Sequence, residues 1–442
     1  MYDPLVDKTP PHTHAMPDSF WATQTNASSY SALIGEQQTD VAIIGGGYTG
    51  LSCAMHLASQ YQIECSVVEA NQPGWGCSGR NGGFVLPGTG RLSLEQMSQK
   101  WGVETAKRIY SEYAESIDLV SELVDDGIDC DKTEGGYLKL AHTPKLLGPL
   151  HQQAKLFSKE YGDSITPLSA GDVKSDYVSG AHSYGGVFYP DAFGINPLRL
   201  CQGLAQKAEF AGADIFANSA VIDVTYNGDK HIIRTPSGRL TANTIIYATN
   251  GYGQRGLTPA LRDRMFPVIS SIVVTEPLNS LQLSAIGIRE GLMVMDTRAL
   301  KYYYRILPDN RLLFGGRGAI SGAKAGDNRY CESLKLGLKE TFPELQNLII
   351  SNFWSGWVSV SLDDYPRVYH DKVNKLLYSG GYCGAGLAFS IQAGKRLAQL
   401  LTEPSTLPDL PYWQTPLKKY PFAFMRRPAL QAFYWWQGLK QK

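Results

Sequence analysis

A glycine turn near the N-terminus constrains the fold more than any other feature of the sequence. Gly45, Gly47 and Gly50 follow the apolar run 41–44, and a helical pattern begins directly after them. The next apolar run ends at Glu69. A strand, a Gly-x-Gly-x-x-Gly turn, a helix and an acidic residue at this spacing are typical of a dinucleotide-binding unit. The pattern predicts that the helix N-terminus binds a pyrophosphate and that Glu69 binds ribose hydroxyls.

Composition and charge exclude several other classes of protein. The 442 residues predict two or three domains, and 41 basic residues balance 41 acidic ones, which argues against a nucleic-acid partner. The uncharged stretch 41–63 has the length of a membrane span, but its glycines favour a strand, turn and helix. No secretion signal opens the sequence, and the seven cysteines form no C-x-x-C motif. We expect a cytoplasmic protein with reduced thiols.

Apolar periodicity predicts further elements along the chain. The expected strands are 63–69, 137–141, 186–189, 220–225, 231–235, 244–248 and 376–379. The expected helices are 51–59, 94–126, 144–161, 196–210, 334–341 and 387–401. Asn196 is the expected N-cap of the fourth helix, with Pro197 in its first turn.

Two more glycine-rich segments favour FAD over NAD. The loop 75–83 stands where a plain nicotinamide domain continues into another helix, and its Ser78 and Asn81 can hydrogen-bond a long cofactor. A flexible surface loop is the alternative. The run 380–386 repeats the strand, glycine turn and helix design, and a helix N-terminus there can stabilise negative charge on a reduced flavin. The turn 248–251 follows a third strand.

The segments 45–54, 76–83, 248–251 and 380–386 together resemble the D-amino-acid oxidase (DAO) superfamily of FAD-dependent oxidoreductases. The resemblance implies an α/β (α+β) fold, in which a Rossmann-like FAD/NAD(P)-binding domain is interleaved with a β-sheet substrate domain. It also implies hydride transfer from a carbon bearing an amine to flavin N5. The resulting imine hydrolyses to an aldehyde or keto product, and O2 or another redox acceptor reoxidises the flavin.

The resemblance also divides the chain and assigns the cofactor site. The expected segments are an N-terminal arm (1–38), FAD-binding parts (39–92, 181–265 and 356–405), mainly substrate-side helices and a strand (93–180), a substrate domain (266–355) and a basic aromatic tail (406–442). The residues expected to bind FAD are Gly45, Gly47, Tyr48, Thr49, Gly50, Glu69, Ala70, Gly76, Cys77, Ser78, Gly79, Arg80, Asn81, Gly82, Gly83, Val221, Thr249, Asn250, Gly251, Gly381, Gly384, Gly386 and Leu387.

Three residues are the candidates for catalysis. Arg317 lies near the place where some relatives have a basic residue for oxygen activation, and a salt bridge at a strand end is the alternative. Tyr302 and Tyr304 share one face of an expected strand, which can line the substrate pocket or pack within the protein. Arg80 is expected to anchor its loop rather than to act in catalysis.

The expected substrate follows from a departure from the family pattern. Amino-acid oxidases that resemble this fold have a carboxylate-binding arginine near the position of Val358, so a bidentate clamp is missing here. Asp363 and Asp364 could attract a cationic amine, or they could form a solvated turn. We expect a small-molecule diamine or a polyamine conjugate such as gamma-glutamylputrescine. The alternatives are an oxidase or dehydrogenase for D-amino acids, glycine or sarcosine, and a flavoprotein that modifies a macromolecule.

Remaining features concern attachment, metals and partners. Cysteines at glycine turns, such as Cys77 and Cys383, are more often small residues that fit the turn, so we expect non-covalent FAD. The eight histidines show no metal-ligand spacing, and we expect no metal. The stretch 411–442 has six basic residues and no acidic one. It predicts a peripheral contact with a membrane or a protein, and packing of an aromatic helix onto the body is the alternative.

Overall fold

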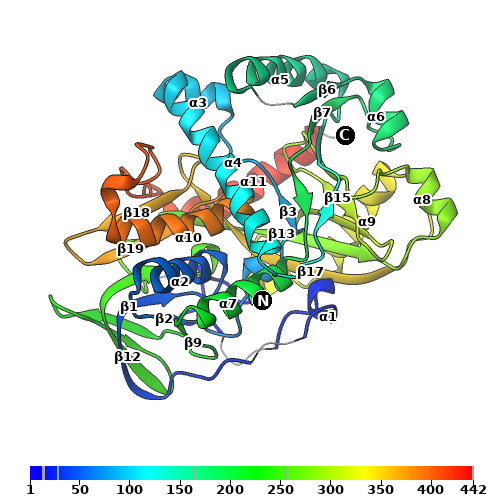
Figure 1. The fold of residues 1–442 in the computed structure, drawn as a ribbon. Helices are drawn as coiled ribbons and strands as arrows, with labels where there is room; N and C mark the ends of the chain where they lie inside the picture. Colours follow the sequence, from blue (N-terminus) through cyan, green and yellow to red (C-terminus); the bar gives the residue numbers. More distant parts are fainter. Residues whose placement is uncertain (12–14, 27–28, 163–164, 254–255, 441–442) are drawn as a thin grey trace.

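The computed structural model describes residues 1–11, 15–26, 29–162, 165–253 and 256–440. Residues 12–14 and 27–28 of the expected arm, 163–164 and 254–255 of the expected middle segments and 441–442 of the expected tail lie outside the described residues. Two eight-stranded sheets form the frame of the protein, and a group of helices packs over the first of them (Figure 1).

The first sheet forms around the apolar run that precedes the glycine turn. Its strands are β1 (Gly35–Ile44), β2 (Cys65–Val68), β9 (Asp214–Phe216), β10 (Asp223–Tyr226), β11 (His231–Arg234), β12 (Gly238–Tyr247), β18 (Arg367–Asp371) and β19 (Leu376–Gly380). β1 lies between β2 and β12 and is parallel to both, and β19 is parallel to β12. The end of β1 at 41–44 is fully buried, as expected for a strand in a covered parallel sheet.

The second sheet is mostly antiparallel. In spatial order its strands are β17 (Ile350–Ser361), β13 (Met265–Thr275), β16 (Leu312–Arg317), β15 (Tyr303–Ile306), β14 (Met293–Asp296), β5 (Tyr137–Leu140), β7 (Gly186–Tyr189) and β6 (Thr166–Leu168). A small third sheet joins β3 (Phe84–Val85), β8 (Phe193–Gly194) and β4 (Thr133–Glu134). These strands come from distant parts of the sequence, so the two large sheets are interleaved along the chain.

The six expected helices are present, one of them divided in two, and further helices lie outside the expected helical ranges. The helices are α1 (Phe20–Thr23), α2 (Tyr48–Tyr61), α3 (Leu94–Trp101), α4 (Val103–Asp125), α5 (Leu147–Tyr161), α6 (Ala170–Asp176), α7 (Pro197–Phe210), α8 (Ser280–Ile286), α9 (Asn328–Thr341), α10 (Leu387–Thr402) and α11 (Arg426–Lys440). Of these, α1, α6, α8 and α11 lie outside the expected ranges. The single helix expected at 94–126 is divided because Gly102, with φ +86°, ends α3. The Asn196 side chain caps α7 as predicted, accepting from the backbone N–H groups of Leu198 and Arg199.

A buried ion pair fastens α4 to the helices over the first sheet. The guanidinium of Arg396 on α10 donates to both carboxylate oxygens of Glu112 on α4, each at 2.8 Å. The Glu112 side chain is 1% exposed and that of Arg396 is 9% exposed. Such a pair is costly to break because either partner alone is left as an uncompensated buried charge. The pair therefore helps to hold the orientation of α10, whose N-terminus faces the cavity described below.

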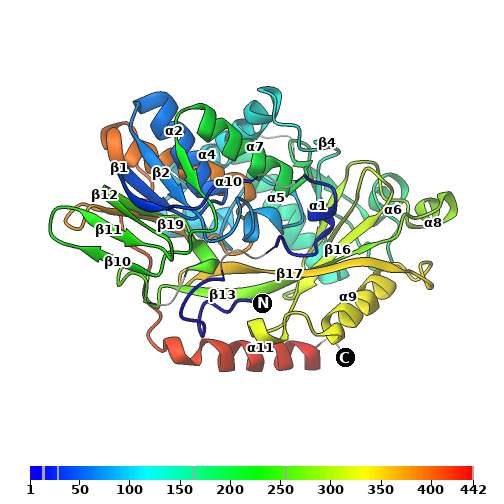
Figure 2. The same cartoon turned by 90° about the horizontal axis from the view of Figure 1, so that it is seen from below.

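The expected N-terminal arm is packed against both sheets. The backbone carbonyl of Tyr2 accepts a hydrogen bond from the Trp357 indole at 2.7 Å. The Trp21 indole donates to the carbonyl of Asn81 at 2.8 Å. The last four residues of the expected arm, 35–38, already belong to β1. At the other end of the chain, α11 runs beneath β13 and β17 (Figure 2).

Within the described part of the chain, no helix is both long enough and apolar enough to cross a membrane. The uncharged stretch 41–63 forms the end of β1 and the helix α2, as its glycines predicted.

Candidate cofactor and active site

One large cavity, of about 810 Å³, is lined by residues of both large sheets and of α11. The first sheet contributes the turn between β1 and α2 together with Glu69 and Val221. The second sheet contributes inward-facing residues of β13, β16 and β17. The cavity therefore extends from the predicted nucleotide clamp to the predicted substrate domain.

At the nucleotide end of the cavity, the start of α2 packs very closely against the backbone of the glycine turn that follows β1. Gly45 has φ +112°, a conformation that favours glycine, and it turns the chain from β1 toward α2. A Cβ atom placed on Gly50 would lie 2.0 Å from the carbonyl oxygen of Gly45. The absence of a side chain at Gly50 therefore allows α2 to begin directly against the turn, with its N-terminus at the cavity.

Glu69 lies beside this turn, as predicted. Its two carboxylate oxygens accept from the backbone N–H groups of Gly46, at 2.7 Å, and Asn71, at 3.0 Å. Burial raises the pKa of Glu69, and the backbone N–H groups oppose that shift. Each carboxylate oxygen can accept a further hydrogen bond, and the side chain lines the cavity.

The turns after β12 and β19 converge on the same place because the strands are parallel neighbours and end at the same edge of the sheet. Asn250, with φ +41°, follows β12, and its side-chain oxygen accepts from the backbone N–H of Gly381 after β19 at 3.1 Å. Thr49 on α2 is hydrogen-bonded to the hydroxyl of Tyr382 at 2.8 Å. These bonds join three glycine turns that are far apart in the sequence.

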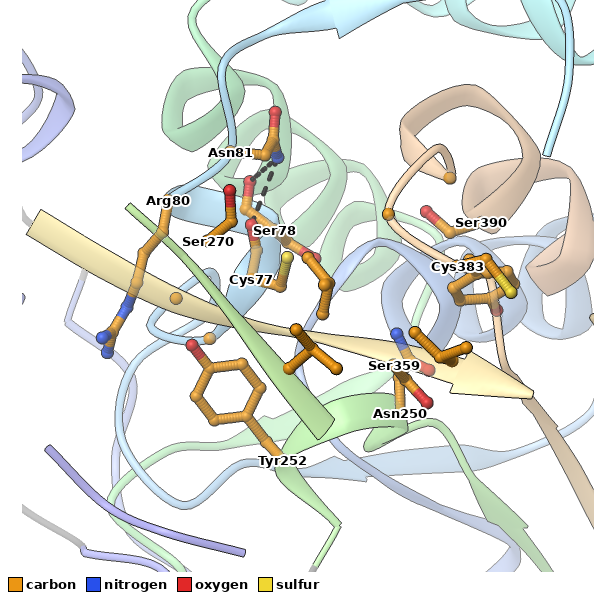
Figure 3. Close-up of a pocket in the computed structure, with 18 of the residues that line it drawn as sticks. Cys77, Ser78, Arg80, Asn81, Asn250, Tyr252, Ser270, Ser359, Cys383 and Ser390 are labelled. Carbon is orange, nitrogen blue, oxygen red and sulfur yellow. Dashed lines mark hydrogen bonds between the residues drawn. The ribbon is translucent and has the colours of Figure 1, made fainter. Parts of the chain in front are cut away.

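The second glycine loop is held mainly by its own polar groups. The Asn81 amide donates to the carbonyls of Cys77 and Ser78, at 3.2 and 3.0 Å (Figure 3). The Ser78 hydroxyl accepts from the backbone N–H of Tyr48 at the start of α2, at 3.0 Å. Asn81 is thus largely committed to the loop, whereas the Ser78 hydroxyl keeps a proton that it can donate into the cavity.

Arg80 anchors this loop, as expected. Its Nε donates to the carbonyl of Trp75 at 2.7 Å, and its guanidinium lies 4.2 Å from the centre of the Trp75 ring. A second donor reaches the carbonyl of Ser355 on β17 at 3.3 Å. Arg80 therefore ties the loop to the second sheet.

Most residues expected to bind FAD line the cavity. They are Gly45, Gly47, Tyr48, Thr49, Glu69, Ala70, Gly76, Cys77, Ser78, Arg80, Asn81, Gly82, Val221, Thr249, Asn250, Gly384, Gly386 and Leu387. Five other expected glycines do not line it: Gly50, Gly79, Gly83, Gly251 and Gly381. These five lie one layer behind the wall, where neighbouring atoms leave little room for a side chain.

The cavity fits FAD on its own geometry. The N-termini of α2 and α10 both face it, which suits a pyrophosphate and a flavin that gains negative charge. A Cβ atom on Gly47 would lie 2.8 Å from the Ser78 hydroxyl, so the wall there is bare backbone. Ser359 lines the cavity with a buried hydroxyl that has no hydrogen-bond partner among the described residues. The dimensions and the donors therefore suit a long, polar, ring-bearing cofactor.

The structure corrects the expected position of two candidate catalytic residues. Tyr302 and Tyr304 pack against Phe314 in the core of the second sheet, with ring centres 4.9 and 5.8 Å from it, and neither lines the cavity. Tyr303, on the opposite face, does line it and is hydrogen-bonded to the Ser270 hydroxyl at 2.9 Å. Three consecutive tyrosines carry no alternation of polarity, so the pattern could not distinguish the buried face from the cavity face.

Arg317 and Val358 lie where the sequence placed them, on the cavity wall. The Arg317 side chain makes no salt bridge within the described part of the chain, so the strand-end ion pair is not formed. Burial lowers the pKa of Arg317, which still stays cationic at neutral pH.

The two aspartates after β17 do not line the cavity. Asp363 is paired with Arg367 at 2.7 Å and is largely buried, and Asp364 lies 3.8 Å from Arg91. Their carboxylates therefore serve the turn rather than a cationic substrate.

Several cavity residues have no signal in the sequence pattern. Arg91, Arg298 and Lys301 line the substrate side, and α11 adds Phe433 and Tyr434. The basic residues stand in loops, and α11 (Arg426–Lys440) is distant in sequence from β17 (Ile350–Ser361) and still more so from β13 (Met265–Thr275). Their proximity arises from tertiary structure alone.

The two cysteines in the cofactor loops both line the cavity. Burial raises the pKa of the Cys77 thiol to about 11, and burial also raises the pKa of Cys383. Both therefore stay protonated at neutral pH, and the thiol is a poor nucleophile in that form.

Comparisons with known proteins identify the family of the chain. A family model described as DAO, FAD dependent oxidoreductase, matches residues 40–400. Gamma-glutamylputrescine oxidoreductase of Escherichia coli (strain K12) is 32% identical over 387 residues, which cover 87% of this chain and 88% of the relative. Glycine oxidase of Bacillus subtilis (strain 168) is 23% identical over 375 residues, which cover 82% and 92%.

Solved structures show the same fold. The crystal structure of glycine oxidase from Geobacillus kaustophilus aligns with a TM-score of 0.69 at 20% identity, covering 86% of this chain and 99% of that one. L-alpha-glycerophosphate oxidase from Mycoplasma pneumoniae, solved with FAD bound, aligns with a TM-score of 0.65 at 16% identity, covering 87% and 97%. These likenesses confirm the expected fold class. The chain therefore belongs to the DAO family of FAD-dependent oxidoreductases.

Proposed function

We propose that this enzyme oxidises a C–N bond of an amine, and that its substrate is a polyamine conjugate such as gamma-glutamylputrescine. The observation that carries the proposal is the cavity, which joins the FAD clamp to a substrate wall that includes Val358. The family resemblance assigns a carboxylate-binding arginine to a position near Val358. The similarity to a gamma-glutamylputrescine oxidoreductase over 87% of the chain supports this substrate class.

The residues of this chain supply binding and orientation. FAD, when bound, supplies the two-electron acceptor for the amine. The N-terminal turns of α2 and α10 would hold its charged parts, and the loop 76–83 would enclose it. Tyr303 and Ser270 present hydroxyls toward the substrate side and fix each other by their hydrogen bond. The imine that leaves the site hydrolyses to an aldehyde and an amine or ammonia.

The main alternative is an oxidase of simple amino acids, as the names of several relatives suggest. Such an enzyme needs a cation that grips the α-carboxylate next to the oxidised carbon. Val358 cannot do so, and for that reason we place glycine and D-alanine among the poor substrates.

The test is anaerobic reduction of the holoenzyme by a panel of amines. We expect gamma-glutamylputrescine to bleach the flavin absorbance at a rate that saturates with concentration, and glycine and D-alanine to reduce it at least about 10-fold less efficiently. Equal efficiency with glycine or D-alanine would contradict the proposal, and so would the absence of reduction by every amine.

We also propose that Arg317 acts in the reaction with O2, where a fixed positive charge stabilises negative charge developing on oxygen. Arg317→Met should slow flavin reoxidation by O2 about 10- to 100-fold and leave anaerobic reduction nearly unchanged. Stopped-flow spectrophotometry separates these two half-reactions. Lys335→Met, on the outer helix α9, is the matched control. Unchanged reoxidation by O2 in the Arg317 variant would remove this role.

A peripheral contact through the tail stays a prediction, and the comparisons give it no support. The tail is partly committed to the body of the protein, because Phe433 and Tyr434 line the cavity. Trp435, next to them, is 68% exposed. Co-sedimentation of the full chain with anionic vesicles, compared with a Trp435→Ser variant, tests whether the exposed side takes part in such a contact.

A further inference from the structure

The substrate side of the cavity has a wall of positive charge, formed by Arg91, Lys301 and Arg317. We refer to these three residues as the cationic wall. Two further cations line the cavity: Arg298 is already neutralised by a salt bridge to Asp296, and Arg80 is committed to its loop. Among the described residues that line the cavity, Glu69 is the only carboxylate, and it belongs to the nucleotide end.

The cationic wall is poorly neutralised by the protein itself. Lys301 and Arg317 form no hydrogen bond or salt bridge through their side chains with the described residues. The ion-pair partner of Arg91 is Asp364, at 3.8 Å, and both side chains are more than 40% exposed. An exposed pair at that distance contributes little.

A polar group from the C-terminal helix faces the same wall. Tyr434 on α11 lines the cavity, and its hydroxyl is buried without a hydrogen-bond partner in the described part of the chain. The charges of Arg317 and Arg91 both act on this hydroxyl and lower the pKa of Tyr434, against the larger rise caused by burial. The hydroxyl is therefore a free donor beside unneutralised cations.

Charge repulsion within the wall favours the binding of an anion. Burial and the charges of Lys139, Arg317 and Arg91 lower the pKa of Lys301 to about 8, and Asp296 opposes that shift. Like charges that face one cavity destabilise each other, and an anion between them removes that cost. A phenol hydroxyl and two or three cations are a suitable donor set for a carboxylate.

We propose that Arg91, Lys301 and Tyr434 form a subsite for a carboxylate of the amine substrate, separate from the carbon that is oxidised. This inference rests on the proposed function and makes its substrate class more specific. Val358 is uncharged and cannot bind a carboxylate attached to the carbon that is oxidised. The carboxylate bound by this subsite therefore belongs to another part of the substrate. A gamma-glutamyl group provides one, because its carboxylate is separated from the reacting amine by an amide chain.

The subsite also predicts that a simple diamine is a poorer substrate than its gamma-glutamyl conjugate. Putrescine carries two positive charges at neutral pH and no anion, so the cationic wall repels it. The conjugate also carries two ammonium groups, but it adds a carboxylate that the wall can bind and that putrescine lacks. Tyr434 lies outside the residues 40–400 that the family model matches, so the C-terminal helix adds to the subsite a donor from beyond the matched part of the fold.

The experiment measures binding of an unreactive probe to the holoenzyme. N-butylglutaramic acid keeps the carboxylate and the amide of gamma-glutamylputrescine and lacks both of its amines. Its uncharged partner is N-butylglutaramide. Binding is followed by the perturbation of the flavin absorbance spectrum and confirmed by calorimetry. We expect the acid to bind about 10- to 100-fold more tightly than the amide, since a charged hydrogen-bonded group contributes on this scale.

Variants assign the effect to the subsite. Lys301→Met and Tyr434→Phe should each weaken binding of the acid about 10-fold without changing that of the amide. Lys301→Arg should restore most of the affinity, which a merely structural role would not predict. Lys335→Met on α9 is the control outside the cavity and should match the wild type.

Two different failures can be distinguished. If acid and amide bind equally well, or if the variants bind the acid like the wild type, the subsite is refuted while amine oxidation stands. If gamma-glutamylputrescine and putrescine reduce the flavin with equal efficiency, the subsite is again refuted. If no amine reduces the flavin but the acid still binds through Lys301, the proposed function fails and the anion site remains.

Discussion

The close approach of α2 to the first glycine turn gives a sharp test of the nucleotide clamp. Replacing Gly50 with alanine would place a Cβ atom 2.0 Å from the Gly45 carbonyl oxygen, whereas such contacts normally exceed about 3 Å. Neither side can relax by a side-chain rotation, because the clashing atom is backbone. The start of α2 must move by about 1 Å, and overpacking of this kind typically costs about 1–3 kcal/mol.

The loss should appear in cofactor binding as well as in stability, because the displaced helix N-terminus faces the cavity. We expect Gly50→Ala to weaken FAD binding by about 10- to 100-fold. Fluorescence titration of the apoprotein with FAD measures the affinity, and thermal denaturation of the apoprotein measures stability separately.

Gly171→Ala is the matched control. Gly171 also lies in a helix, α6, but its added Cβ would have only an ordinary contact, at 3.6 Å from the Ser169 hydroxyl. Because alanine favours the helix by up to about 1 kcal/mol over glycine, this variant should be neutral or slightly stabilised. Gly50→Ala with the FAD affinity and melting temperature of the wild type would refute the close-packing argument.

Three further predictions concern stability, attachment and pH. Arg396→Met should lower the free energy of unfolding by about 3–5 kcal/mol in chemical denaturation, because it leaves Glu112 buried and unpaired. The control is Glu115→Gln, which removes the charge of the other carboxylate partner of Arg396. The Glu115 side chain is 53% exposed, so this change should cost less than about 1 kcal/mol. Acid precipitation should release all the flavin into the supernatant, since both cavity thiols have raised pKa values; flavin retained in the pellet would contradict this. Binding of N-butylglutaramic acid should weaken as the pH rises through about 8, the pKa of Lys301, because the group that binds the anion loses its charge. The bound anion stabilises the charged form of Lys301 and shifts the midpoint of this loss upward. A pH dependence of binding that is unchanged in Lys301→Met would refute the assignment.

The nucleotide end of the site could be predicted from the sequence because its determinants are local. The turn at 45–50, the acidic residue at Glu69 and the loop 76–83 each lie within one short segment, and their spacing reflects the geometry of a strand followed by a helix. Even the expected FAD-binding glycines that do not line the cavity, such as Gly50, allow the close backbone packing one layer behind its wall. Gly102 shows the limit of periodicity, because an apolar helical pattern continues across a glycine that ends the helix.

The substrate end could not be predicted in the same way because it is assembled from distant segments. The choice between Tyr303 and its neighbours depends on which face of β15 meets Phe314, and no local pattern carries that information. Arg91 and Lys301 are ordinary loop cations in the sequence, and Tyr434 belongs to a tail whose aromatic residues suggested a surface contact. The loops that carry Arg91 and Lys301, together with the packing of α11 beneath the second sheet, bring these groups to one cavity (Figure 2).

The most direct test of the central claim is the flavin content of the purified protein, followed by its anaerobic titration with gamma-glutamylputrescine. The cavity predicts a yellow protein with one FAD per chain, and complete bleaching by the conjugate. A colourless protein that takes up no FAD would contradict the assignment of the cavity, and a yellow protein that no amine can bleach would contradict the proposed reaction.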